Sequence, residues 1–185
     1  MNVPVMANLM AQGKQPEILF WVGSAGSFDD RAKKITKAFI KILNKANVDF
    51  AVLGTEESCS GDPAKRSGNE FLFQMQAMMN IQVLNGYEVK KIVTGCPHCF
   101  NTLKNEYPEL GGNYEVVHHT QLIQSLIEEG KLTVSGGDTF KGKKITFNSE
   151  RNLGLREPVI FPRERGFDHD KAVIKHADKV LRKKE

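Results

Sequence analysis

The chain has 185 residues, of which 40% are hydrophobic and 26% charged, with a formal net charge of +4. These values are typical of one globular domain with a hydrophobic core and exclude a low-complexity chain. The positive excess lies mainly in residues 141–144 and 179–184 without interleaved aromatic side chains, so we expect no nucleic-acid binding.

The amino-acid sequence shows neither the pattern of a membrane-spanning segment nor that of an export signal. No stretch approaches the roughly 20 consecutive apolar residues that span a bilayer, and residues 1–15 lack the basic start and apolar run of a signal peptide. We therefore expect a cytoplasmic protein without a transmembrane segment. Its three cysteines, an odd number, favour metal or redox chemistry over a disulfide framework in that compartment.

Short apolar runs alternate with helical patterns. After a short helix around residues 6–11, strands are predicted over residues 17–22, 49–53, 91–94, 114–117 and 143–147, with helices between them. This alternation predicts an α/β fold with an open, mostly parallel, doubly wound sheet of about five strands and helices on both faces.

The longest predicted helix spans residues 69–84. One wide apolar face of this helix is predicted to pack in the core, and it consists of Phe71, Leu72, Met75, Met78, Met79 and Val83.

The character of the chain changes after residue 147. Residues 148–166 show no clear periodicity, and one amphipathic helix is predicted over about residues 168–182. We therefore divide the chain into an α/β domain, residues 1–147, and a divergent C-terminal tail, residues 148–185.

The candidate ligands all follow predicted strands. Ser24 follows the first strand, Cys59 the second, and the sequence Cys96-Pro97-His98-Cys99 the third. Because the carboxyl ends of parallel strands meet at one edge of a sheet, we expect these side chains to converge there. Thiolates are soft ligands that suit an iron–sulfur cluster or zinc. Glu56 and Glu57, beside Cys59, are expected to be solvated.

The order of these residues resembles a known family. The cysteine-rich CCG domain of heterodisulfide reductases and related iron–sulfur oxidoreductases carries a cysteine, a Cys-Cys-Gly sequence and a Cys-x-x-Cys pair at similar intervals. Here these places hold Ser24, Cys59-Ser60-Gly61 and Cys96-Pro97-His98-Cys99. The flanking residues 21–23, 54–63 and 96–101 are also similar, and the resemblance covers about residues 6–147.

The resemblance implies a [4Fe–4S] cluster, or a three-iron form, held by Cys59, Cys96 and Cys99, with Ser24 in the place of the first cysteine. It also implies electron transport in a heterodisulfide reductase-like oxidoreductase complex whose partners are flavin- or ferredoxin-type protein subunits. The chain departs from the pattern at Ser24 and Ser60. It resembles only the N-terminal half of the family's members, because Arg151 stands where the second half would open with a cysteine.

Three other interpretations stay open. The Cys96-Pro97-His98-Cys99 sequence is also typical of a thiol–disulfide oxidoreductase, although that fold continues with a hairpin instead of another strand–helix unit. The three cysteines with His98 or His118 would form a structural zinc site. A non-catalytic domain that binds a partner, or a homo-oligomer, is the third interpretation.

Overall fold

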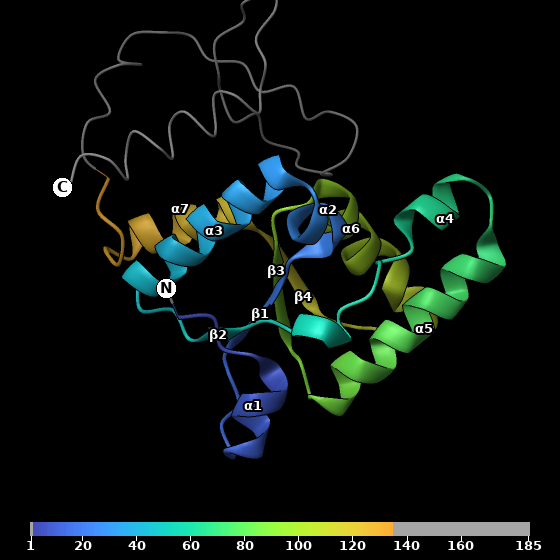
Figure 1. Cartoon of the computed structure of the whole chain (residues 1–185), viewed down its shortest axis with the longest axis horizontal. Coiled ribbons are helices and arrows are strands. Elements are labelled where there is room, and N and C mark those ends of the chain that lie inside the picture. The colour runs from blue at the N-terminus through green and yellow to red at the C-terminus, as the bar shows by residue number, and fades with distance from the viewer. Residues whose placement is uncertain (1, 135–185) are drawn as a thin grey trace, which may run out of the picture.

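The computed structural model describes residues 2–134 (Figure 1). Its centre is a parallel sheet with strands in the order β2-β1-β3-β4. The strands are β1 Ile18–Trp21, β2 Phe50–Ala51, β3 Lys91–Thr94 and β4 Glu115–His118. The predicted fold class is confirmed, but the described sheet has four strands instead of about five. The predicted strand at 143–147 and the tail at 148–185 lie outside the described residues.

Helices connect the strands. They are α1 Met6–Ala11, α2 Gly23–Phe28, α3 Asp30–Lys45, α4 Asp62–Arg66, α5 Glu70–Gly86, α6 Pro97–Asn101 and α7 His119–Glu128. A 3-10 turn, η1 Gly54–Glu56, follows β2, while a π-helical turn, η2 Thr102–Glu106, and a 3-10 turn, η3 Tyr107–Leu110, extend α6. Asp29 caps α3 and Asn69 caps α5, because each side chain accepts a hydrogen bond from a backbone N–H of the first turn.

The core forms two layers because successive residues of a buried strand face opposite sides. Leu19 and Trp21 pack in the layer that contains α5 and α6, whereas Ile18 and Phe20 pack in the layer of α3 and α7. Figure 1 shows α3 and α7 on one side of the sheet, and α4 and α5 on the other. All four residues of β1 are buried, as expected for a central strand covered on both faces.

The chain reverses its direction of winding at β1. This strand pairs with β2 on one side and with β3 on the other, in register through Leu19, which faces both Ala51 and Ile92. The connection to β2 runs through α3 in one layer, and the connection from β2 to β3 runs through α5 in the other layer. The carboxyl ends of β1 and β3 therefore form a topological switch point, where open α/β sheets bind ligands.

The orientation predicted for α5 is wrong. Its buried residues are Phe73, Ala77, Asn80, Ile81 and Leu84. Five of the six side chains predicted to face the core are exposed, with Phe71 at 76% and Met78 and Met79 both at 60%. Val83 alone is half-buried and packs against the core. Both faces of this helix are apolar, so the sequence period alone did not select one of them. The buried face carries Asn80, whose amide hydrogen-bonds to Ser58, Cys59 and Tyr107.

Candidate functional site

The cysteine pair, Cys96 and Cys99, lies at the carboxyl end of β3. Cys96 is the N-cap of α6, and its sulfur accepts a hydrogen bond from the Cys99 backbone N–H at 3.5 Å. Pro97 occupies the first helical position, where its fixed φ suits the start of a helix. Cys96 is half-buried and Cys99 is buried. The sequence between the cysteines therefore places both sulfurs at one helix start.

The two thiols differ in acidity. The Cys99 thiol donates a hydrogen bond to the Cys96 sulfur. Together with the backbone N–H groups of Cys99 and His98, it lowers the pKa of Cys96 to about 6, against the opposing effect of burial. The pKa of Cys99 is raised, first by the neighbouring Cys96 thiolate and then by burial. Cys96 is thus a thiolate at neutral pH and Cys99 a thiol.

The end of β1 approaches this pair closely. A Cβ atom added to Gly23 would lie 3.3 Å from the Cys99 sulfur and 3.8 Å from the Cys96 Cβ. Gly23 also has a φ of +77°, which favours glycine. The backbone before Ser24 therefore lies against the cysteine pair, while the Ser24 side chain itself is exposed.

Glu57 connects the loop around Cys59 to the end of β1. Its carboxylate accepts hydrogen bonds from the backbone N–H of Val22 at 3.0 Å and of Gly23 at 2.5 Å. Burial raises the pKa of Glu57 to about 7, although the two N–H groups oppose the shift. The expectation that Glu57 is solvated is therefore wrong, because its carboxylate is buried. Nothing in the local sequence indicates this, since the hydrogen-bond partners Val22 and Gly23 lie far away in the chain.

A buried polar network holds the loop of residues 57–61, here called the Cys59 loop. The Asn80 amide donates to the Cys59 carbonyl at 2.9 Å and to the Tyr107 hydroxyl at 3.0 Å. The Tyr107 hydroxyl donates in turn to the Ser60 carbonyl at 3.1 Å. Burial raises the pKa of the Tyr107 hydroxyl, although its hydrogen bond with Asn80 opposes the shift.

The Cys59 loop meets the cysteine pair through Ser60. The Ser60 hydroxyl hydrogen-bonds to the Cys99 thiol and lowers its pKa, against the larger opposing effects. Ser60 is itself buried, at 3% exposure. The structure thus brings the Cys59 loop, the cysteine pair and the backbone of Gly23 to the same end of the sheet.

The described side chains do not form a site for a single metal ion. Within residues 2–134, no three side chains of histidine, cysteine, aspartate or glutamate lie close enough together to hold one metal ion. In an iron–sulfur cluster each cysteine binds a different iron, so the sulfurs need not converge on one point. His118, a candidate zinc ligand, is engaged elsewhere, because its Nδ1 lies 2.8 Å from the Thr120 hydroxyl and its ring packs on Phe100.

Two further features fit a sulfur-rich group. Gly23 leaves open the space that a side chain would fill beside the Cys99 sulfur. Trp21, at the end of β1, packs in the same core layer as Cys99 and is fully buried. Its indole Nε1–H has no hydrogen-bond partner among the described residues. Such donors hydrogen-bond to cluster sulfurs and influence the reduction potential.

The chain matches a known protein family. Residues 18–104 match the model of the family described as the cysteine-rich CCG domain. This part of the chain belongs to the CCG family. The resemblance noted in the sequence is therefore confirmed. No solved structure matches the chain.

Relatives of the CCG domain are redox proteins. The chain is 44% identical over 177 residues to an "EtfAB:quinone oxidoreductase" of Syntrophomonas wolfei, covering 95% of this chain and 23% of the relative. It is 50% identical over 161 residues to a "Probable iron-sulfur-binding oxidoreductase FadF" of Bacillus subtilis, covering 87% and 22%. A heterodisulfide reductase chain of Methanosarcina barkeri is 29% identical over 150 residues, covering 78% and 36%.

The chain spans between 22% and 36% of the length of these three relatives. Each relative is therefore much longer than the part of it that this chain matches. Within residues 2–134, no helix has the length and apolar character that crossing a membrane requires.

Proposed function

We propose that this CCG domain binds an iron–sulfur cluster through Cys59, Cys96 and Cys99 and transfers electrons within an oxidoreductase complex. The observation that carries the proposal is the meeting of the Cys59 loop with the cysteine pair around Gly23, in a domain whose relatives include an iron-sulfur-binding oxidoreductase. With three cysteines the cluster is either a [4Fe–4S] form with Ser24 at the fourth position or a three-iron form.

Each residue of the site has a defined task in this proposal. Cys96 is already a thiolate and is the first ligand, while Cys99 releases its proton when the metal binds. Glu57 holds the end of β1 against the Cys59 loop. Asn80 and Tyr107 fix the backbone of that loop. When bound, the cluster supplies one-electron transfer.

The partners follow from the same proposal. Since relatives include a quinone oxidoreductase and a heterodisulfide reductase, we propose flavin- or ferredoxin-type subunits as electron donors or acceptors in the cytoplasm. A homo-oligomer of this chain is a less specific alternative that light scattering on the purified chain would detect.

The test is iron and acid-labile sulfide analysis of the full chain after anaerobic reconstitution, together with EPR. We expect three to four iron atoms per chain in the wild type and no more than traces in Cys59→Ser, Cys96→Ser and Cys99→Ser. The exposed Ser27→Ala is the matched control and should load like the wild type. Ser24→Cys should increase cluster lifetime in air. Zinc as the only metal, or no metal at all, would refute the proposal.

The asymmetry of the cysteine pair favours a second candidate function, thiol–disulfide exchange. An acidic, half-buried Cys96 beside a buried Cys99 is the arrangement of an attacking and a resolving thiol. The fully parallel sheet of residues 2–134 speaks against the hairpin-containing thioredoxin fold. Cys59→Ser separates the two functions, since it should abolish the cluster but leave a Cys96–Cys99 disulfide able to form in a glutathione buffer.

A further inference from the structure

The outer face of α5, on the side of this helix away from the sheet, carries an apolar patch (Figure 1). Its five side chains, here called the α5 patch, are each between 40% and 76% exposed: Phe71, Leu72, Met75, Met78 and Met79. Taken at about 200 Å² for each fully covered side chain, these fractions give on the order of 500 Å² of exposed apolar surface. The largest apolar patches of monomeric proteins measure about 300–600 Å² and are often functional. The α5 patch is therefore large enough to be an interaction surface.

The α5 patch contains no charged side chain. Glu70, at the start of α5, is the one charged residue of the helix, and the exposed Gln74 and Gln82 beside the patch are uncharged. The other long helix, α3, exposes instead a row of lysines: Lys34, Lys37, Lys41 and Lys45. A helix face turned to water usually carries charges, as α3 does, whereas the centre of an interface between proteins is depleted of them.

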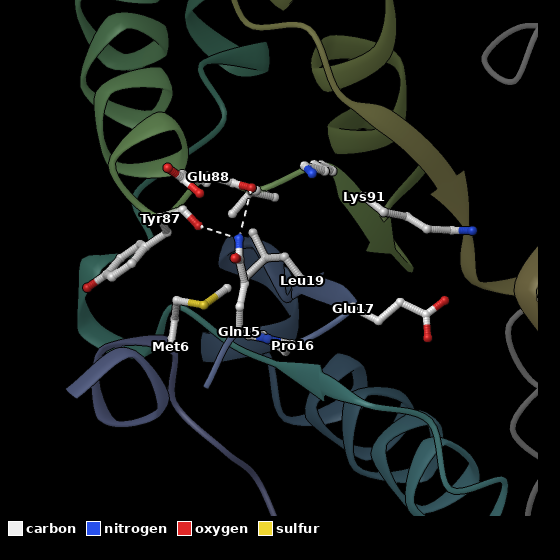
Figure 2. A pocket seen from close by; sticks show the side chains of 10 residues that line it. Met6, Gln15, Pro16, Glu17, Leu19, Tyr87, Glu88 and Lys91 are labelled. Atoms are coloured by element: carbon white, nitrogen blue, oxygen red, sulfur yellow. Dashed lines mark hydrogen bonds between the residues drawn. The ribbon is translucent and has the colours of Figure 1, made fainter. Parts of the chain in front are cut away.

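The α5 patch lies outside the two pockets that open at the ends of the sheet. One pocket, of about 350 Å³, lies beside His119 at the ends of β1 and β3, and its lining mixes apolar with charged residues. The other, of about 310 Å³, lies at the amino end of the strands (Figure 2). The Gln15 amide crosses it and donates to the backbone carbonyls of Tyr87 at 3.3 Å and Glu88 at 3.2 Å. Since no pocket contains its residues, the α5 patch suits a protein partner better than a small molecule.

The positions of the α5 patch are symmetric about Met75. Phe71 and Met79 lie four residues before and after it. Leu72 and Met78 lie three residues before and after it. The ridges of a helix surface run at these two spacings, so both ridges cross at Met75. Two copies of the chain packed antiparallel would place Met75 on the two-fold axis. Phe71 then faces Met79 of the second copy, and the other pair faces in the same way.

The antiparallel arrangement also keeps like charges apart. Glu70 lies five residues before Met75, so the two Glu70 side chains lie at opposite ends of the pair, roughly 15 Å apart along the helices. That separation exceeds the Debye length of about 8 Å at physiological ionic strength. With on the order of 500 Å² of apolar surface from each copy, and the polar residues around it, the pair reaches the lower end of the roughly 1,200–2,000 Å² of a specific interface.

We propose that the α5 patch is the interface of a homodimer, in which two copies of this chain pack their α5 helices antiparallel across a two-fold axis at Met75. Flexible methionine side chains let the two identical surfaces fit each other. Asn80, on the buried face of α5, holds the Cys59 loop, so each Cys59 loop lies one helix behind the interface. Dimerisation depends on the patch and not on the proposed cluster.

The test is sedimentation velocity of the full-length chain, reduced and metal-free, from about 1 µM to about 300 µM. We expect a monomer–dimer equilibrium with a Kd on the order of 10 µM, since the interface is small. Phe71→Glu should weaken dimerisation at least tenfold, because it places two carboxylates in the apolar contact. Phe28→Glu is the matched control and should dimerise like the wild type, since Phe28 is 80% exposed on α2, outside the α5 patch.

Opposite charges at the two-fold axis test the antiparallel arrangement. Met75→Glu and Met75→Lys should each stay monomeric up to about 100 µM, because like charges meet at the axis. Their equimolar mixture should associate at least tenfold more tightly than either variant alone. Circular dichroism of each variant reports whether it is folded, as expected for substitutions at exposed positions.

Several results would overturn the proposal. A wild type that stays monomeric at about 300 µM has no such interface. A dimer that survives both Phe71→Glu and Met75→Glu uses another surface. A mixture of the two Met75 variants that stays monomeric would refute the antiparallel arrangement. A monomeric wild type whose Tm falls by more than about 5 °C in Met75→Glu would show that residues 135–185 of the same chain cover the patch.

The dimer and the cluster can fail separately. Sedimentation of the metal-free chain reports on the dimer, and iron content after reconstitution reports on the cluster. A chain that dimerises but binds no iron would refute the cluster alone, and a chain that binds iron but stays monomeric would refute the dimer alone.

Discussion

Two single residues, Gly23 and Glu57, determine how closely the backbone at the end of β1 lies to the sulfurs of the cysteine pair. Gly23 is the clearest case, because its position combines a left-handed backbone with direct contact to the cysteine pair. Glu57 acts through its carboxylate, which accepts two backbone N–H groups of the β1 end. Neither residue is among the proposed ligands. Both determine where the cysteines of the site lie.

The substitution Gly23→Ala should reduce iron binding by more than the conformational cost of alanine in a left-handed backbone explains. An L-residue in the left-handed region costs about 1–2 kcal/mol. Gly68→Ala is the matched control, since Gly68 has a similar φ of +81° but no atom within 4 Å of an added Cβ. Both variants should lose similar stability in urea, whereas only Gly23→Ala should also lose most of its reconstituted iron. Equal iron content in the two variants would show that the contact with Cys99 is unimportant.

His119 should make the metal-free protein sensitive to acid. Burial, together with the charge of His118, lowers the pKa of His119 to about 3, against about 6.5 in an unfolded chain. Between these values the unfolded chain binds a proton that the folded chain does not, so stability falls as the pH falls. His119→Phe should therefore lose less stability than the wild type between pH 7 and pH 4, by up to about 3 kcal/mol.

The measurement for His119 is urea unfolding of the reduced, metal-free chain at several pH values. Glu57, whose raised pKa gives a slope of opposite sign, is present in both proteins and cancels in the comparison. The exposed His98→Phe serves as the control and should follow the wild type. Parallel pH profiles of wild type and His119→Phe would contradict the burial of this imidazole.

At the scale of elements, α5 shows how packing chooses between two apolar faces. The face that carries Asn80 is buried, because its amide reaches the Cys59 carbonyl and the Tyr107 hydroxyl. The methionine-rich face is left exposed. The helix therefore serves the site by holding the Cys59 loop, and its buried face is set by polar as well as apolar contacts.

Two substitutions in α5 test this orientation. Met78→Gln changes a side chain that is 60% exposed and should alter the free energy of unfolding by less than about 0.5 kcal/mol. Leu84→Ala removes a fully buried side chain and should cost about 2–5 kcal/mol. Urea denaturation of the two variants measures both. The reverse ranking would mean that the methionine face is the buried one.

For the whole molecule, the site joins loops that follow three neighbouring strands. The cysteine pair follows β3, the Cys59 loop follows β2, and Gly23 follows β1 between them. A bound cluster would tie these loops together. Because such a group binds only the folded chain, its binding free energy adds to the stability of the fold.

Metal removal should therefore lower the melting temperature. Treatment of the reconstituted wild type with a chelator and oxidant, followed by reduction of the thiols, should lower Tm by at least about 5 °C. Cys59→Ser, treated in the same way, should melt at the same temperature before and after. Differential scanning calorimetry measures both, and an unchanged Tm in the wild type would mean that the cluster does not link the loops.

The sequence by itself determined the architecture and the end of the sheet at which the candidate ligands lie. Continuous apolar runs such as residues 18–21 mark strands covered on both faces, and their alternation with helices predicts the parallel sheet. Since parallel strands end at one edge, the positions of Cys59 and Cys96 after strands placed both at the same end of the fold.

Only the tertiary structure decided which groups surround those ligands. Local periodicity could not select between the two apolar faces of α5. The bonds of Glu57 to residues 34 and 35 positions away leave no local signal. The pocket beside His119 forms only where the ends of β1 and β3, the start of α3 and the start of α7 meet. These features depend on contacts between distant segments, which become defined only when the chain is folded.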